Sequence, residues 1–291
     1  MVDWSANAKP KSGKDSIWWC IGRRRGNGLH VEAPVNARTR KEAAGVITAE
    51  LRACAIGGLS ALVGLDFPYG YPGGFAASLG LAGAPWRATW DELSRRIQDS
   101  QATSTNNRFD VAAQLNSAIG PRGPGPFWGC PESAESAALL KTKPEFPFGA
   151  LAEFRITERH IPGPKATWQL FYNGSVGSQA LLGIPYLAQL RDDPQLAGVS
   201  QVWPFETGAS LPPRSEGRGR VIHAEIYPSF IAARREPGEV KDSAQVRALV
   251  EYFADRDQHG QLGAHFSAPA RLPLRERAQV LAEEGWILGV E

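Results

Sequence analysis

The sequence has few cysteines and no long hydrophobic run. Its 291 residues include three cysteines, Cys20, Cys54 and Cys130, which are too few and too scattered for a disulfide framework or a Cys-x-x-Cys metal cage. The longest uncharged apolar stretch, residues 53–65, has 13 residues, whereas about 17 are needed to span a bilayer. The first residues also lack the apolar core of a signal peptide. We therefore expect a cytoplasmic protein with no membrane partner.

An excess of charge of one sign is also missing. There are 32 Lys and Arg residues against 30 Asp and Glu residues, a net charge of +2. This balance argues against an extended track for a polyanion, but it is compatible with a nucleotide or a short nucleic-acid strand as partner. The motifs of P-loop NTPases, nucleophile-elbow hydrolases, zinc proteases and dinucleotide-binding folds are absent. Any chemistry must come from another arrangement of residues.

The hydrophobic pattern predicts a series of strands around one amphipathic helix. The helix is expected to begin at Thr39, because Thr39 and Glu42 form a capping box and apolar side chains follow at helical spacing. The next strand is apolar on both faces and ends at Pro68, as in a sheet covered by helices on both sides. Strands are expected over residues 2–5, 16–22, 29–33, 59–68 and 221–228.

A long segment separates the last of these strands from the others. Residues 70–219 are too many for one loop, so we expect an insertion that interrupts a core formed by residues 1–69 and 220–291. Three strands in a meander, a helix and a strand, followed after the insertion by a strand and a helix, is the element order of an RNase H-like fold in the α/β class. Helices are expected over 89–97, 133–140, 178–190, 242–257 and 274–284.

Four acidic residues fall on the elements of this core. Asp3 lies on the first strand, Asp66 at the end of the central strand, Glu225 on the later strand, and Asp242 at the start of the helix after it. An unpaired carboxylate beside the apolar neighbours of Asp66 would be costly or would shift its pKa. A divalent ion held by carboxylates from different strands would compensate that charge, and Mg²⁺ or Mn²⁺ suits all-oxygen ligands. The pattern predicts an acidic metal cluster for phosphodiester hydrolysis.

Each of these acids also has a simpler interpretation. Asp66 fits a turn-opening residue whose side chain bonds backbone amides, and Asp3 fits an exposed N-terminal residue. Glu225 alternates with His223 on one strand face, which is also the pattern of an edge strand with one solvated face. Asp242 fits a capping box with the Gln three residues later. The sequence leaves these interpretations open.

Five short motifs resemble those of a known family. The motifs are VDWSA, VGLDFPYG, FRITE, AEIYPS and KDSAQVRAL, which begin at residues 2, 63, 154, 224 and 241. Together they resemble a bacterial and archaeal family of predicted RNase H-fold nucleases that is catalogued as a domain of unknown function. The resemblance extends over nearly the whole chain. It implies the same four residues as the acidic cluster, with Arg155 and Glu158 as a further pair near the site.

Arg155, Glu158 and His223 are the candidates for substrate binding. Arg155 has a planar donor fork that suits a phosphoryl group, although an ion pair with Glu158 on a helix surface explains the same spacing. His223 points the same way as Glu225 and suits metal binding or proton relay. We expect a hydrolase acting on a nucleic acid or nucleotide with Mg²⁺ or Mn²⁺. The alternatives are a sugar-kinase-like nucleotide-dependent enzyme, a cofactor-biosynthesis enzyme, and a non-catalytic module that binds a ligand or a partner.

Overall fold

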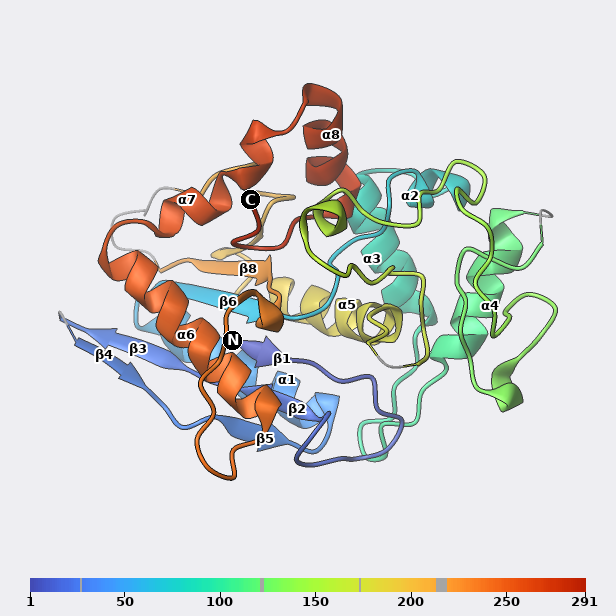
Figure 1. Ribbon diagram of the computed structural model, residues 1–291. Helices are drawn as coiled ribbons and strands as arrows, with labels where there is room; N and C mark the ends of the chain where they lie inside the picture. Colours follow the sequence, from blue (N-terminus) through green and yellow to red (C-terminus); the bar gives the residue numbers. More distant parts are fainter. Residues whose placement is uncertain (27, 121–122, 173, 213–218) are drawn as a thin grey trace.

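A mixed six-stranded sheet lies at the centre of the protein (Figure 1). The structure is a computed structural model and describes residues 1–291 apart from 27, 121–122, 173 and 213–218. The sheet strands are β1 (Val2–Asp3), β2 (Ile17–Trp19), β5 (Val35–Ala37), β6 (Ala61–Leu65), β7 (Ser200–Val202) and β8 (Val221–Glu225). Their order is β5-β2-β1-β6-β8-β7. β1, β6, β8 and β7 run parallel, and β2 runs antiparallel to both of its neighbours.

Helices cover both faces of this sheet. They are α1 (Arg40–Ile56), α2 (Phe75–Ser78), α3 (Pro85–Arg96), α4 (Arg108–Ile119), α5 (Gly177–Arg191), α6 (Lys241–Gln258), α7 (Leu262–Phe266) and α8 (Leu274–Gln279), which continues as a π-helix (Val280–Glu284). α6 covers one face, where Val246 and Val250 pack with Cys20. α1 and α5 cover the other, where the Trp4 ring lies 5.4 Å from that of Tyr186 on α5 (Figure 1). This double cover explains why β6 is apolar on both faces.

The register of the central strands determines which side chains share a face. Val2 lies opposite Leu65, and Leu65 lies opposite Glu225. Residues in register point to the same face of a sheet, and successive residues point to opposite faces. Glu225 therefore shares the face of α1 and α5 with Leu65. Asp3 and Asp66, each one residue further along, belong to the face covered by α6.

The α/β class with a mixed sheet is confirmed, and a strand forms at the predicted third position, but its predicted place in the main sheet is wrong. Residues 29–33 were expected to complete a meander, yet β4 (Gly28–Val31) pairs with β3 (Gly22–Arg25) as a separate two-stranded sheet. The third strand of the meander in the main sheet is β5, where Ala37 is fully buried opposite Ile17. The β4 residues Leu29 and His30 are exposed, so they bury too little surface to compete for that place.

Residues 70–219 contain confirmed and unexpected elements. α3 and α5 confirm two predicted helices, and α5 continues through Pro185. The predicted helix over 133–140 is wrong, because the Ser136 hydroxyl accepts the Leu139 N–H at 3.2 Å and closes a turn instead. α4 was not predicted. β7 extends the main sheet and α5 packs on it, so this segment contributes to the central layers.

The remaining core elements follow their sequence patterns. Thr39 is the N-cap of α1, and its hydroxyl accepts the Glu42 N–H at 3.2 Å. β8 and α6 lie where the later strand and helix were predicted. In the part of the chain that the structure describes, no helix combines the length and the apolar character needed to cross a membrane.

Candidate acidic site

Two of the predicted acids meet where β1 and β6 end. Asp3 is the last residue of β1, and Asp66 directly follows β6, its parallel neighbour. Their carboxyl groups lie close enough to shift each other's pKa, and the Trp4 N–H donates to Asp66 Oδ1 at 2.5 Å. Both side chains are half-buried and still reach solvent. Two carboxyl groups thus lie in contact at the carboxyl edge of the central strands.

The contact changes the acidity of both groups. Burial, followed by the charge of Asp242, raises the pKa of Asp3 to about 7. Burial and the neighbouring Asp3 raise the pKa of Asp66 well above its usual value. Two carboxylates this close cannot both ionise cheaply without a cation, so the pair retains a proton. The backbone hydrogen bond from Trp4 is the contact that the turn interpretation of Asp66 expects, whereas the neighbouring Asp3 and the raised pKa are features of a site.

Asp242 approaches the same pair from α6. The N-cap residue of α6 is Val240, and its side chain makes no capping hydrogen bond. The capping box considered for Asp242 is therefore not formed. The Asp242 carboxylate instead accepts the Asp15 N–H at 2.7 Å, and its charge contributes to the raised pKa of Asp3. The structure therefore brings Asp3, Asp66 and Asp242 together from three separate elements.

Asp15 is a member of this group that the sequence did not single out. It closes the loop between β1 and β2, has a positive φ of 54°, and adds to the negative charge that raises the pKa of Asp3. The Lys11 ammonium lies 3.5 Å from the Asp15 carboxylate. The available signal was topological: a residue that precedes the second strand of an antiparallel pair must lie beside the end of the first.

Glu225 does not join the other three acids. The register places it on the opposite face of the sheet, and its carboxylate accepts Arg155 Nη1 and Nη2 at 2.8 and 2.6 Å. The Tyr69 N–H donates to the same carboxylate at 3.1 Å. The alternation along β8 showed which residues lie on the same face of the sheet as Glu225. It did not show that this face is the one covered by α1 and α5 and not by α6. Its charge is compensated by a guanidinium, where the sequence had suggested a metal ion.

Arg155 and Glu158, the predicted substrate-binding pair, belong to that buried network. Arg155 Nε donates to Glu158 at 2.9 Å, and Nη1 also donates to the Glu284 carbonyl at 2.9 Å. Arg155 and Glu158 are 1% and 3% exposed at their side chains. Burial raises the pKa of Glu158, and the adjacent Arg155 opposes the shift. All the contacts of the Arg155 guanidinium are with protein groups, and it faces no solvent. This buried arrangement differs from both the phosphate site and the surface ion pair that the sequence suggested.

His223 is also inside the protein. β8 is buried along its whole length between β6 and β7, so it is not the solvated edge strand considered above. His223 Nε2 is 2.6 Å from the Ser200 hydroxyl, and Nδ1 has no hydrogen-bond partner among the described residues. Burial lowers the pKa of His223 to about 3. A neutral core histidine is the result.

Replacing His223 with Gln is expected to reduce the acid sensitivity of the fold. The unfolded chain takes up the His223 proton near pH 6.5, whereas the folded chain does so only near pH 3. The stability that neutral His223 contributes is therefore fully present above pH 6.5. It is lost as the pH falls below that value, by up to about 1.4 kcal/mol per pH unit. Urea unfolding at pH 7 and pH 4.5 should show about 2 kcal/mol more loss for the wild type than for His223→Gln. The exposed His259→Gln variant is the control and should behave like the wild type. An equal loss of stability in the wild type and in His223→Gln would contradict a buried neutral His223.

The acidic site does not offer a complete set of protein ligands for a metal, but it suits a divalent ion that takes only one or two ligands from the protein. No group of three or more His, Cys, Asp or Glu side chains within the described ranges is arranged to ligate a metal. Mg²⁺, however, is usually held by one or two carboxylates together with water and substrate phosphates. Asp3 and Asp66 supply two neighbouring carboxyl groups, and the nearby Lys241 offsets their charge only in part, because the pKa of Asp3 stays raised. The donor set therefore suits Mg²⁺ or Mn²⁺.

Comparisons with known proteins add no further identification. The chain matches no protein-family model, and searches of curated proteins and of solved structures return no match. The resemblance to predicted RNase H-fold nucleases thus rests on the five motifs. The functional argument depends on the geometry of the acidic site.

Proposed function

We propose that the protein is a divalent-metal-dependent phosphodiester hydrolase with an RNase H-like core. The observation that carries the proposal is the contact between the Asp3 and Asp66 carboxyl groups at the ends of two adjacent parallel strands. In open α/β sheets, ligands bind outside the carboxyl ends of the strands. A half-buried acid pair with raised pKa values at that edge is a functional-site signature.

The sheet topology supports the RNase H-like assignment. The first three sheet strands form an antiparallel meander, β1-β2-β5, and β6 and β8 then add in parallel on the other side of β1. α1 connects the meander to β6, and α6 follows β8. This is the order of elements expected from the sequence once β5 replaces residues 29–33 as the third strand.

Asp3 and Asp66 would hold the ion, with the Asp242 carboxylate near Asp3. When bound, the ion supplies positive charge that activates water and stabilises the leaving oxygen. The protein contributes orientation: the Trp4 N–H fixes Asp66, and the Asp15 N–H fixes Asp242. The exposed Lys241 adds a positive charge near Asp3 that suits an anionic substrate. Compensation of the pair by an ion would release the proton that it shares in the metal-free state.

Calorimetric titration with Mn²⁺ tests the proposal directly. We expect about micromolar binding by the wild type, and binding at least about tenfold weaker for Asp66→Asn, because one of two anionic ligands is removed. Asp110→Asn, which changes an exposed carboxylate on α4, serves as the control and should bind like the wild type. A nuclease screen with RNA, DNA and nucleotides follows. If neither the wild type nor the control binds Mn²⁺, the metal-hydrolase proposal fails and a non-catalytic binding module is favoured.

A further inference from the structure

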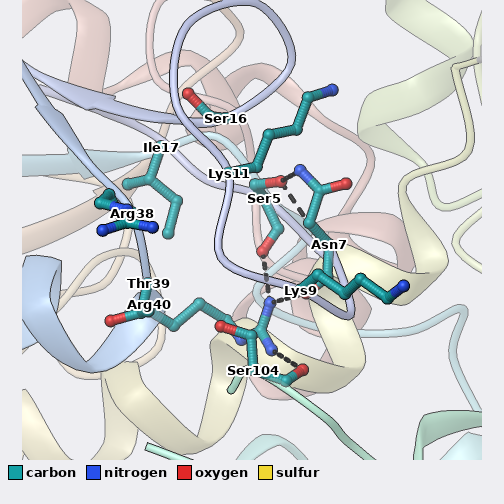
Figure 2. Close-up of a pocket in the computed structure, with 10 residues that line it drawn as sticks. All are labelled: Ser5, Asn7, Lys9, Lys11, Ser16, Ile17, Arg38, Thr39, Arg40 and Ser104. Carbon is teal, nitrogen blue, oxygen red and sulfur yellow. Dashed lines mark hydrogen bonds between the residues drawn. The ribbon is translucent and has the colours of Figure 1, made fainter. Parts of the chain in front are cut away.

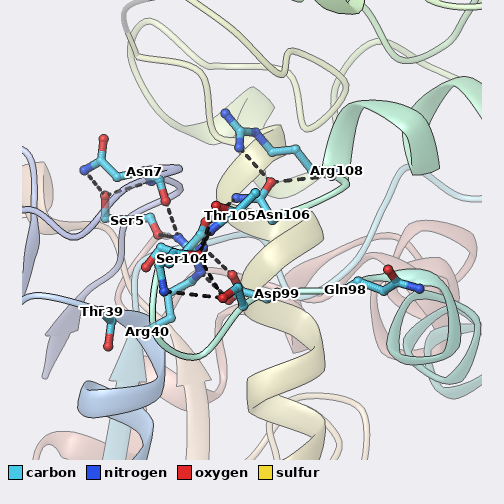
Figure 3. A network of polar contacts seen from close by, with 12 residues as sticks. Ser5, Asn7, Thr39, Arg40, Gln98, Asp99, Ser104, Thr105, Asn106 and Arg108 are labelled. Atoms are coloured by element: carbon cyan, nitrogen blue, oxygen red, sulfur yellow. Dashed lines mark hydrogen bonds and ion pairs between the residues drawn. The ribbon is translucent and has the colours of Figure 1, made fainter.

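Two hollows in the protein differ in the space that they offer. The first lies between the β1–β2 loop and the start of α1 (Figure 2) and has about 10 Å³, which is room for about one water molecule. Arg40, which lines it, already donates to the carbonyls of Ser5, Asn7 and Ser104 (Figure 3). The second has about 240 Å³. Since a cavity of about 150 Å³ accommodates benzene, the second hollow is large enough for an organic ligand.

The second hollow, which we call the C-terminal cavity, lies between residues 152–159 and the π-helix that follows α8. Ala152 and Arg159 are exposed and form its rim. Ile156 and Glu284 also line it, although they are only 3% and 1% exposed. π-Helical turns often occur at functional sites. No residue of the acidic site lines this cavity, so it is a separate candidate for ligand binding.

The charged residues of the cavity differ in whether they have a partner of opposite charge. The Glu153 carboxylate lies 2.9 Å from the Lys143 ammonium, and the Arg159 guanidinium lies 3.1 Å from the Glu276 carboxylate. Each of these pairs is neutral overall. The Glu284 carboxylate has no ion pair within the described residues, because its contacts are N–H groups of neutral residues. The cavity therefore has one uncompensated negative charge in its lining.

Glu284 keeps one acceptor position for a ligand. Its Oε1 accepts the Gly73 N–H at 2.8 Å and Gln279 Nε2 at 2.6 Å, whereas its Oε2 accepts only the Ile156 N–H, at 2.6 Å. A carboxylate has about four acceptor positions, two on each oxygen, so Oε2 retains one. A buried carboxylate without a cation is costly. A donor that brings positive charge to this position is therefore favoured.

The surroundings of Glu284 are short of positive charge. The Arg155 guanidinium is already shared by Glu158 and Glu225, and it reaches Glu284 only at its main-chain carbonyl. Glu283, the preceding residue of the π-helix, is also buried. Burial raises the pKa of Glu283, and the charge of Glu284 adds to this increase. A cation that enters the cavity would be attracted by carboxylates that the protein leaves uncompensated.

We propose that the C-terminal cavity binds an organic cation, an ammonium group on an apolar body about the size of one aromatic ring. The ammonium group donates to Glu284 Oε2, and the apolar body packs against Phe154 and Ile156, which line the cavity. The charge-assisted hydrogen bond selects the cation, and the burial of the apolar body adds affinity. This binding does not depend on the proposed hydrolase activity, which belongs to the acidic site.

Titration with three ring compounds of similar size tests the proposal. Phenethylamine, phenethyl alcohol and phenylacetate are added separately to the metal-free protein at pH 7, and ligand-observed NMR measures each Kd. Phenethylamine should bind with a Kd of about 1 mM, and the neutral and anionic compounds should bind at least about tenfold more weakly. No binding of phenethylamine would overturn the proposal. Equal or tighter binding of phenylacetate would also overturn it, and would assign the cavity to an anion held by Arg159.

Two variants locate the bound amine. Glu284→Gln should weaken phenethylamine about tenfold and leave phenethyl alcohol unchanged, because only the charge is lost; binding of the alcohol shows that the cavity is still formed. Ala152→Trp places a large side chain at the rim, leaves the hydrogen bonds of Glu284 in place, and should weaken both compounds at least about tenfold. Ala137→Trp, at an exposed position outside the cavity, is the control and should bind like the wild type. Unchanged binding of phenethylamine in Glu284→Gln or in Ala152→Trp would overturn the proposal.

Discussion

Asp66→Asn is expected to abolish metal-dependent hydrolysis without weakening the fold. The substitution removes one of the two carboxylates that face each other at the end of β1 and β6. With Mn²⁺ in excess the weakened site can still be filled, but an ion with one of its two protein ligands removed is no longer held in place to activate water. Loss of several kcal/mol of transition-state stabilisation lowers kcat by about 10³-fold. The kcat is measured on the substrate that the wild type cleaves in the nuclease screen, with Mn²⁺ in excess. A kcat within about threefold of the wild type would contradict the assignment of Asp66.

The stability of the same variant distinguishes a functional carboxylate from a structural one. Asn retains the acceptor oxygen for the Trp4 N–H, and it has no charge to place beside Asp3. Because the pKa of Asp66 is raised in the folded protein, the metal-free wild type loses stability as the pH rises through that value. The variant is spared this loss, so its free energy of unfolding at pH 8 should equal or exceed that of the wild type by about 1 kcal/mol.

Urea unfolding with a chelator at pH 5 and pH 8 provides the measurement. A variant that is less stable by more than about 1 kcal/mol at both values would support the alternative considered from the sequence, in which Asp66 opens a turn. If the Asp3–Asp66 pair serves function and lowers the stability of the fold, the variant should lose activity and keep its stability. Asp110→Asn again serves as the matched control on an exposed helix surface.

The elements with a strong local signal could be predicted from the sequence. β6 was recognisable because it is apolar on both faces, and α1 because Thr39 and Glu42 mark its start. β5 has only three residues, with no alternation that distinguishes it from a loop. The segment that does look like a strand, residues 29–33, pairs locally with β3 instead. The choice between them depends on tertiary burial, which a local pattern does not contain.

The acidic site was predictable only in part, for a similar reason. Asp3 and Asp66 could be grouped because both stand where adjacent strands end, and the structure places them in contact. Glu225 stands at the end of the next strand, but the relative register of β6 and β8 assigns it to the opposite face. That register is a property of the assembled sheet. Asp15 was missed because its role depends on the pairing of β1 with β2.

Arg155→Met is expected to destabilise the protein by about 3–5 kcal/mol, the range for loss of one partner from a buried ion pair. The substitution leaves Glu158 and Glu225 buried without their guanidinium. Neither carboxylate can turn to water, because both side chains are 3% exposed. Urea unfolding at pH 7 measures the change, and the surface variant Arg95→Met should lose less than about 0.5 kcal/mol.

A companion variant separates a structural Arg155 from one that binds substrate. In Arg155→Met/Glu158→Gln/Glu225→Gln the unpaired charges are removed together with the guanidinium, so at least half of the lost stability should return. If the network only supports the fold, the refolded triple variant should keep the wild-type KM for the substrate that the nuclease screen finds. A KM raised about tenfold or more at recovered stability would restore the substrate-binding role that the sequence suggested. Because the Arg155 fork donates to Glu158, Glu225 and the Glu284 carbonyl and is 1% exposed, we expect the first result.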